Sequence, residues 1–365
     1  MKRVFAILCC LCLMLCACSN APAEPAPTAT PTTQTPTVPT TVPETEPPTE
    51  PTEPPVLYRN PLNGKPLDEP YTGRIVAVVI NNLKDALPHH GVSAADIFYE
   101  AETEGGITRC LAVYSDLSGV GSIGPVRSAR TFFNNLSLSY DAPIVHCGGS
   151  VRGRNAYADR DGGKITDWEH LDQVYNGSYF FRDQARYSSG YNWEHTLFTT
   201  GEDLLRAMDD KGYSTTQEQN FGLNFDEEIT LNGQAVNKLV VHFRGSKTTT
   251  FTYNPDNHLY HTEQYGSTYI DANTGEQMTF RNVMVLYTDQ SFRHDGEYSR
   301  SYYELVGEGE GVLSIDGQLV NIHWSRSELS EPFVYTLEDG TPVTLGIGST
   351  YIAIAAETSE PVEVE

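Results

Sequence analysis

The chain has 365 residues, of which 39% are hydrophobic and 20% charged, a composition typical of a folded protein with room for two ordinary domains. Its formal net charge of −24 excludes the broad basic surface that a nucleic-acid-binding protein needs, so no nucleic-acid partner is expected. The same charge opposes adsorption to an anionic membrane surface, so membrane attachment would require a separate anchor.

The first eighteen residues have the pattern of a bacterial lipoprotein signal. A charged start precedes an apolar run that is too short to span a bilayer by itself. The segment ends in Leu-Cys-Ala-Cys-Ser-Asn, which resembles a lipobox with Cys18 as the residue that receives the lipid. The alternative is an ordinary cleaved signal peptide that happens to be rich in cysteine. On the lipobox interpretation residues 1–18 hold the signal, and acyl chains on Cys18 anchor an extracytoplasmic protein to the bilayer of the cell membrane.

Residues 19–55 are almost entirely Pro, Thr, Ala and Glu. Such a segment buries little apolar surface and favours extended, polyproline-like conformations. We expect a disordered stalk that carries the folded body away from the bilayer. The alternative is a plain tether without any binding role.

Residues 56–222 are predicted to form an α/β domain, because strand and helix patterns alternate there. Strands are predicted at 74–82, 93–103, 107–116, 142–150 and 179–183. A helix is expected over 129–140, where large apolar residues recur with helical spacing. A second helix is expected after Thr200, which with Asp203 forms a capping box, and Gly212 is expected to end it.

From residue 223 to 358 the pattern changes to short β-rich runs separated by turn pairs. These pairs are Asn232-Gly233, Asp316-Gly317 and Asp339-Gly340. Asn-Gly or Asp-Gly between apolar runs is a strong local signal of a β-hairpin. We expect a mostly antiparallel β domain, a sandwich or an open barrel, followed by an acidic tail at 359–365. The predicted fold class is α+β with two domains.

Cys110 and Cys147 are the cysteines of the folded body, and each lies in a predicted core strand. In an oxidising compartment they either pair as a disulfide or remain two buried thiols, and both alternatives stay open. Two cysteines are too few for a disulfide framework or a zinc site. The calcium-like run at 159–170 has His170 where a bidentate glutamate belongs. We therefore expect no metal and no cofactor.

Several segments together resemble the YerB-like lipoproteins of Gram-positive bacteria, a family defined by a domain of unknown function. The most specific are ADIFYEAETEGGITR at 95–109 and IGPVRSAR at 123–130. The others are NPLNGKPL at 60–67, VAVVINN at 76–82, HCGGS at 146–150, DANTGE at 271–276, DGQLVNIHW at 316–324 and GSTYIAI at 348–354. The resemblance implies a lipid anchor and a body with N-terminal and C-terminal domains, and it implies no established activity.

Three arginines lie close together in this otherwise acidic chain: Arg109, Arg127 and Arg130. Arg127 and Arg130 are three residues apart where a loop enters a predicted helix, so they are expected to project toward the same side. Free N–H groups at a helix N-terminus, together with guanidinium groups, make a site for anions. We expect a loop that binds phosphate, pyrophosphate, a uronic acid or a peptide carboxylate. The alternative is that the arginines only tie the loop to the acidic strand before it.

Glu100, Glu102 and Glu104 alternate along the end of a predicted strand, so a regular strand would place all three on one face, with Arg109 across from them. They form either a polar floor that holds an arginine or an ordinary charged sheet edge. If the site is catalytic, Glu100 and Glu102 are candidates for proton transfer.

His146 closes the strand before a glycine turn, and ligands of open α/β sheets bind at such strand ends. His146 and Ser150 are a candidate pair of base and nucleophile, although no G-x-S-x-G motif is present. The alternative is a structural histidine, with Ser150 serving only as a ligand-binding residue. Arg182 and His195 are further candidates for ligand binding.

These observations favour a non-enzymatic lipoprotein that binds an anionic cell-wall polymer or an envelope protein through its arginines. A rival hypothesis is an envelope enzyme that acts on a phosphorylated or glycan substrate, with the arginines stabilising developing charge. A third is a pure protein-interaction scaffold, in which internal carboxylates saturate the arginines.

Overall fold

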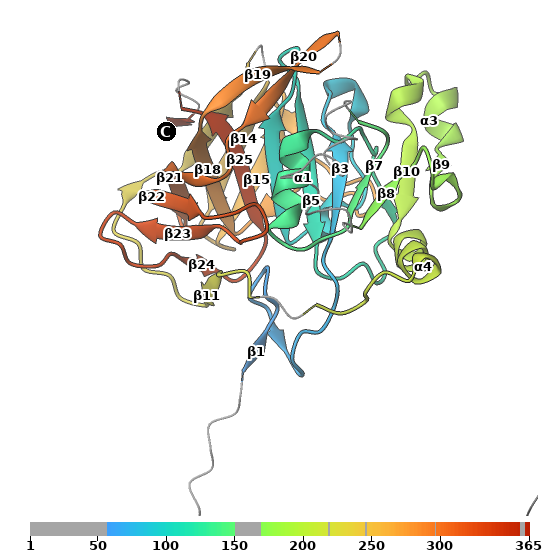
Figure 1. Cartoon of the computed structure of the whole chain (residues 1–365). Helices are drawn as coiled ribbons and strands as arrows, with labels where there is room; N and C mark the ends of the chain where they lie inside the picture. The colour runs from blue at the N-terminus through green and yellow to red at the C-terminus, as the bar shows by residue number, and fades with distance from the viewer. Residues whose placement is uncertain (1–56, 150–168, 218–219, 245–246, 296, 358–361) are drawn as a thin grey trace, which may run out of the picture. The chain divides into compact units, whose positions relative to one another are not determined.

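The structure is a computed structural model of the chain (Figure 1). It describes residues 57–149, 169–217, 220–244, 247–295, 297–357 and 362–365. The predicted signal with Cys18, the predicted stalk, Ser150 and most of the calcium-like run at 159–170 lie outside the described residues. Among the described residues, no helix combines the length and the apolar character that crossing a membrane requires.

The fold is built on an 11-stranded sheet in the order β12-β22-β21-β18-β25-β4-β5-β3-β7-β8, with β23 paired to β22 (Figure 1). Its N-terminal strands are β3 (Val76–Asn81), β4 (Ile97–Glu102), β5 (Thr108–Tyr114), β7 (Ile144–His146) and β8 (His170–Asp172). Its C-terminal strands are β12 (Gln234–Ala235), β18 (Asn282–Thr288), β21 (Gly307–Ile315), β22 (Gln318–Arg326), β23 (Val334–Leu337) and β25 (Thr350–Ala356). The N-terminal part is mixed and the C-terminal part mostly antiparallel, which confirms the predicted α+β class.

The two parts of this sheet meet where β25 pairs in parallel with β4, from Thr350 opposite Ile97 to Ile354 opposite Ala101. Strands β3, β4 and β5 are buried along their whole length, as their nearly continuous apolar runs require. One sheet therefore runs from the N-terminal region into the C-terminal region.

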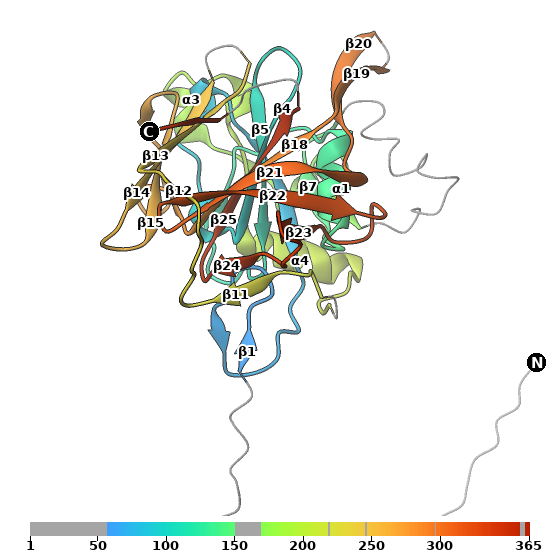
Figure 2. The ribbon, with the colours of Figure 1, turned by 90° about the vertical axis from the view of Figure 1, so that its left-hand side faces the viewer.

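A second, six-stranded sheet covers one face of the first through a shared apolar core that includes Phe98, Val241 and Phe251. Its strands are β13 (Lys238–His242), β14 (Thr248–Asn254), β15 (Leu259–Gln264), β16 (Ser267–Thr268), β17 (Thr279–Phe280) and β26 (Val362–Val364). Helix α1 (Thr131–Leu138) covers the other face, where Phe132 and Phe133 are fully buried. The sheets thus stack as in a sandwich, seen from a second side in Figure 2.

Smaller elements surround the sheets. They are β1 (Tyr58–Arg59), β2 (Pro66–Leu67), β6 (Ser122–Ile123), β9 (Phe181–Arg182), β10 (Leu197–Thr200), β11 (Asn224–Asp226), β19 (Gln290–Asp295), β20 (Tyr298–Tyr303) and β24 (Thr344–Gly346), with helices α3 (Gln184–Ser188) and α4 (Gly201–Lys211). Short 3-10 helices are η1 (Lys84–Ala86), η2 (Val92–Ala94), η4 (Gly177–Tyr179) and η5 (Trp193–His195). Strands β19 and β20 form a hairpin that projects from the body (Figure 2).

The structure decides between the two alternatives for the cysteines: Cys110 and Cys147 are both free thiols. Burial raises the pKa of each thiol, so both stay protonated and unreactive. The chain end predicted as an acidic tail contributes strand β26, which pairs with β13, and Glu365 there reaches Lys238 with a 2.8 Å ion pair.

Candidate functional site

The segment with the sequence IGPVRSAR crosses the ends of strands β3 and β7. Arg127 donates its backbone N–H to Val79 at 2.9 Å and accepts a hydrogen bond from Cys147 N–H at 3.1 Å. Asn81 donates to Pro125 at 2.8 Å, so the loop is held like an extra strand against the sheet. This placement brings Arg127 and Arg130 beside Arg109, which lies near the start of β5.

Of the three predicted arginines, Arg109 is buried and makes no ion pair with a described acid. Its side chain donates to the Ser128 carbonyl at 2.7 Å, its residue is only 5% exposed, and its Nε–H has no hydrogen-bond partner. Within the described part of the chain, no carboxylate lies within ion-pair distance of it. Burial and the positive charges of Arg130 and Arg127 hold the pKa of Arg109 well below its usual range. Among the described residues, Arg109 is therefore a buried cation with no carboxylate in contact.

The other two predicted arginines are paired with glutamates. Arg127 makes an ion pair with Glu194, and both side chains keep some exposure, 26% and 41%. Arg130 bonds Glu104 through two nitrogens, one of them Nε at 3.0 Å, and Arg300 from β20 reaches the same carboxylate. Although burial favours the neutral acid, the hydrogen bonds and charge of Arg130 lower the pKa of Glu104 to about 2.

Arg182 and His195, the two further candidates for ligand binding, lie near Arg127, whose positive charge acts on both. Arg182 donates to the Trp193 carbonyl at 2.6 Å and stacks on the Trp193 ring, with 4.3 Å between its guanidinium carbon and the ring centre. His195 Nδ1 lies 2.9 Å from Asn81 Nδ2, and its Nε2 lies 3.7 Å from Glu194. Burial lowers the pKa of His195, so it contributes no fixed charge near neutral pH.

We call Arg109, Arg127, Arg130, Arg182 and Arg300 the arginine cluster. Among the residues that the structure describes, their five guanidinium groups contact two carboxylates, Glu104 and Glu194. The cluster is therefore locally positive in an acidic chain, and its composition suits an anion. Sequence reasoning missed Arg300, which comes from a hairpin far along the chain and carries no local signal.

The prediction that three glutamates share a face with Arg109 is wrong. Strand β4 ends at Glu102, and the following turn carries the chain away, so Glu104 contacts Arg130 instead of continuing the alternation. Arg109 lies opposite Ala101 in the ladder, which places it on the face away from Glu100 and Glu102. Alternation predicts a face only while the strand lasts, and the register was not visible in the sequence.

Glu100 belongs to a different, fully enclosed site. It is 0% exposed, and Lys247 Nζ lies 3.0 Å from its Oε1 with both side chains buried. Its two oxygens accept hydrogen bonds from Asn82, Thr108, Thr249 and Tyr351. Sequence reasoning missed Lys247, because a lysine just before a threonine-rich strand ordinarily faces water.

Glu102 and His146 are also largely enclosed. Glu102 accepts the backbone N–H of Arg244 at 3.1 Å, and burial raises the pKa of its carboxyl. His146 is 0% exposed, with Nδ1 2.8 Å from the Gly148 carbonyl and 3.9 Å from Asp172. Burial lowers the pKa of His146 to about 4, so the ring is neutral at pH 7.

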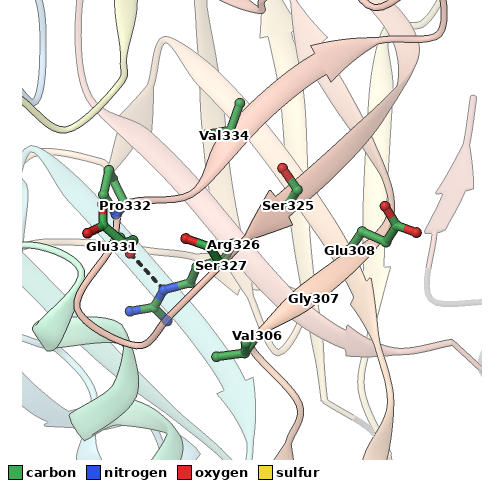
Figure 3. Close-up of a pocket in the computed structure, with 9 residues that line it drawn as sticks. All are labelled: Val306, Gly307, Glu308, Ser325, Arg326, Ser327, Glu331, Pro332 and Val334. Carbon is green, nitrogen blue, oxygen red and sulfur yellow. Dashed lines mark hydrogen bonds between the residues drawn. The ribbon is translucent and has the colours of Figure 1, made fainter.

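A pocket of about 570 Å³ lies away from all of these residues, between strands β21 and β22 and the loop after β22 (Figure 3). Glu308, Ser325 and Val334 are among its lining residues, and Arg326 donates to the Glu331 carbonyl at 2.8 Å beside it. A neighbouring pocket of about 600 Å³ holds the Glu310–His323 ion pair. No three metal-ligating side chains gather anywhere among the described residues.

The chain combines a mixed sheet, whose inner strand β5 carries Arg109, with a mostly antiparallel region. Two family models match the corresponding parts of its sequence. Residues 62–214 match the N-terminal domain, and residues 239–352 the C-terminal domain, of a "Protein of unknown function (DUF3048)". The chain belongs to the YerB-like family.

The comparisons of sequence and of structure both find the YerB protein of Bacillus subtilis. The protein described as "Putative lipoprotein YerB" from Bacillus subtilis (strain 168) is 29% identical over 300 residues, which cover 81% of this chain and 86% of the relative. The crystal structure of YerB protein from Bacillus subtilis superposes with a TM-score of 0.71 at 27% identity, covering 84% of this chain and 99% of that chain. The fold and the family resemblance are thus confirmed.

Proposed function

We propose that this chain is a lipoprotein anchored through Cys18 to the outer face of the cell membrane, and that its body binds an anionic cell-envelope ligand at the arginine cluster. The lipobox pattern supports the anchor, and so does the description of the Bacillus subtilis relative as a lipoprotein. The proposed domains are the α/β region at 56–222, which carries the site, and the β-rich region at 223–358.

The observation that carries the binding proposal is Arg109. An enclosed cation that no described carboxylate contacts, with an unused Nε–H donor, is unfavourable by several kcal/mol unless a counter-ion reaches it. Arg127 offers the approach, because its ion pair with Glu194 is partly exposed and such pairs contribute only about 0–1 kcal/mol. An incoming anion can therefore replace Glu194 at little cost.

The proposal is tested by isothermal titration calorimetry of the full-length protein in detergent micelles against inorganic phosphate and pyrophosphate at low salt. We expect binding that Arg127→Gln weakens about tenfold, the loss of roughly 1.4 kcal/mol. Arg206→Gln is the matched control, since Arg206 is an exposed arginine on α4 paired with Asp203. Equal binding by wild type and Arg127→Gln, or no binding by either, contradicts the proposal.

The scaffold hypothesis has one observation in its favour, since Arg127 and Arg130 are both paired with internal glutamates. It predicts no heat with any small anion. The enzyme hypothesis lacks such support, because Glu100 and His146 have no exposed surface through which a substrate could reach them.

A further inference from the structure

Exposed aromatic side chains flank the arginine cluster on both sides. Trp193 is 54% exposed and Tyr187 51%, and their rings meet edge to face at 5.6 Å. On the hairpin β19–β20, Tyr298 is 61% exposed and Phe292 46%. Figure 1 shows this hairpin and helix α3 near the same end of the central sheet, with β3 between them. Tyrosine and tryptophan are enriched at interaction surfaces, because each combines an apolar ring with a polar group.

A series of side-chain contacts and chain neighbours connects the two aromatic groups. Trp193 is the chain neighbour of Glu194, which pairs with Arg127. Arg127 is followed by Ser128, whose carbonyl receives Arg109. Two residues further, Arg130 bonds Glu104, and Glu104 also bonds Arg300. Arg300 in turn stacks on Tyr298, with its guanidinium carbon 4.8 Å from the ring centre.

We infer that the ligand is an anionic glycan polymer, a chain of sugar rings with a repeated carboxylate or phosphate, lying along this series from Trp193 to Tyr298. The inference rests on the proposed function and names its ligand class. Arg127 and Arg300 keep partly exposed side chains, 26% and 24%, and two such guanidinium groups are matched by repeated charges, whereas a single small anion would occupy one of them. The apolar C–H face of a sugar ring packs against an exposed aromatic face, as Trp193 and Tyr298 present at the two ends.

The rest of the body restricts where such a polymer binds. With a net charge of −24, most of the chain repels a polyanion, so contact is favourable only where arginines are in local excess. Arginine, tryptophan and tyrosine are also the residues that most often carry binding energy at interfaces. The arrangement of guanidinium groups between rings at the two ends therefore sets the position of the bound chain.

The experiment measures the binding of galacturonic acid, its tetramer and its octamer to the full-length protein in detergent micelles. We expect the octamer to bind at least about tenfold more tightly than the monomer, because linked sites add avidity. Trp193→Ala and Tyr298→Ala are each expected to weaken octamer binding about three- to tenfold and to leave monomer binding unchanged. Leu205→Ala on α4, a comparably exposed apolar residue, is the control and should change neither.

The outcomes separate the inference from the proposal beneath it. If monomer and octamer bind equally and Arg127→Gln weakens both, the polymer inference fails and the anion site stands. If the monomer, the octamer and inorganic phosphate all fail to bind, the proposed function fails. Tighter binding of polyglutamate or single-stranded DNA of the same charge than of the octamer would overturn the choice of a glycan.

Discussion

Lys247 and Glu100 form a pair of opposite charges with almost no contact with water, 1% and 0% exposed at the side chain. Lys247 Nζ also donates to Thr249 at 2.6 Å and to Gln264 at 3.2 Å, and its charge lies over the Tyr265 ring. Because every partner is polar and in place, the pair is tolerated in an apolar core. It also joins strand β4 to the second sheet, so its integrity matters beyond its own residues.

We predict that Lys247→Met lowers the free energy of unfolding by about 3–5 kcal/mol, because it leaves the buried Glu100 carboxylate without its counter-ion. Urea denaturation followed by fluorescence measures the change. Lys238→Met is the control: the Lys238–Glu365 pair is exposed, 35% and 57%, and its loss should cost less than about 1 kcal/mol. Equal, small losses in both variants would show that Lys247 is not a buried cation.

His89 gives the stability a pH dependence. Burial lowers the pKa of His89 to about 3, while Nε2 contacts the Asn81 carbonyl and Nδ1 the Tyr269 hydroxyl, each at 2.6 Å. An unfolded histidine has a pKa of about 6.5. Below that pH His89 therefore binds a proton in the unfolded chain but stays neutral in the folded chain. Stability therefore rises with pH across this window and falls as the pH drops from about 6.5 toward 3.

The slope is expected to approach about 1.4 kcal/mol per pH unit for this one histidine. Urea denaturation between pH 6.5 and 5, where most carboxylates stay ionised, compares the wild type with His89→Gln. The variant should be less stable at pH 6.5 and should lose less with falling pH. Parallel curves for the two proteins would mean that His89 is protonated in the folded state.

At the scale of elements, helix α4 depends on its two ends. Thr200 Oγ1 accepts the N–H of Asp203 at 3.0 Å and donates to its carboxylate at 2.9 Å, and Gly212 ends the helix in the left-handed conformation. We predict that Thr200→Ala costs about 1 kcal/mol of stability and Thr200→Ser close to none, because serine keeps the capping oxygen. Thermal unfolding measures both, and an equal loss in the two variants would point to the lost methyl group instead of the cap.

What the sequence could predict follows from the range of each interaction. The ends of α4 and the strands β3, β4 and β5 were predicted and confirmed, because caps and apolar runs are local. The grouping of Arg109 with Arg127 was also predicted. The alternative that the arginines tie the loop to the acidic strand before it corresponds to the Arg130–Glu104 pair, whereas the pairing of Arg127 with Glu194 was not predicted. Glu194 and Arg300 reach the site through contacts between distant segments, and no local pattern selects such partners.

At the scale of the whole molecule, the N-terminal and C-terminal family regions share one sheet and one buried site. Residues Pro55–Glu365 form a single compact unit. Strand β25 completes the sheet beside β4, and Tyr351 on β25 donates to Glu100 at 2.8 Å across a separation of 251 residues. Such a contact has no sequence signature. The predicted boundary at residue 222 therefore gave no indication that the regions on its two sides share a sheet and a buried site.

Each of the two family regions depends on the other for its part of this sheet and of the Glu100 site. A fragment of residues 56–222 should not unfold cooperatively by itself, because β4 would expose an unpaired edge and Glu100 would lose Lys247, Thr249 and Tyr351. Fragment 223–365 should fare similarly, since β25 would lose its pairing with β4 and the buried Lys247 would lose Glu100. Thermal unfolding of each fragment, of an equimolar mixture and of intact 56–365 provides the comparison. We expect a sharp transition for the intact body and its recovery in the mixture, because the fragments can rebuild the β4–β25 pairing. A sharp transition for 56–222 alone would show that this region, which carries every residue of the arginine cluster except Arg300, is an independent domain, and the shared sheet would then be a docking contact between two folded units.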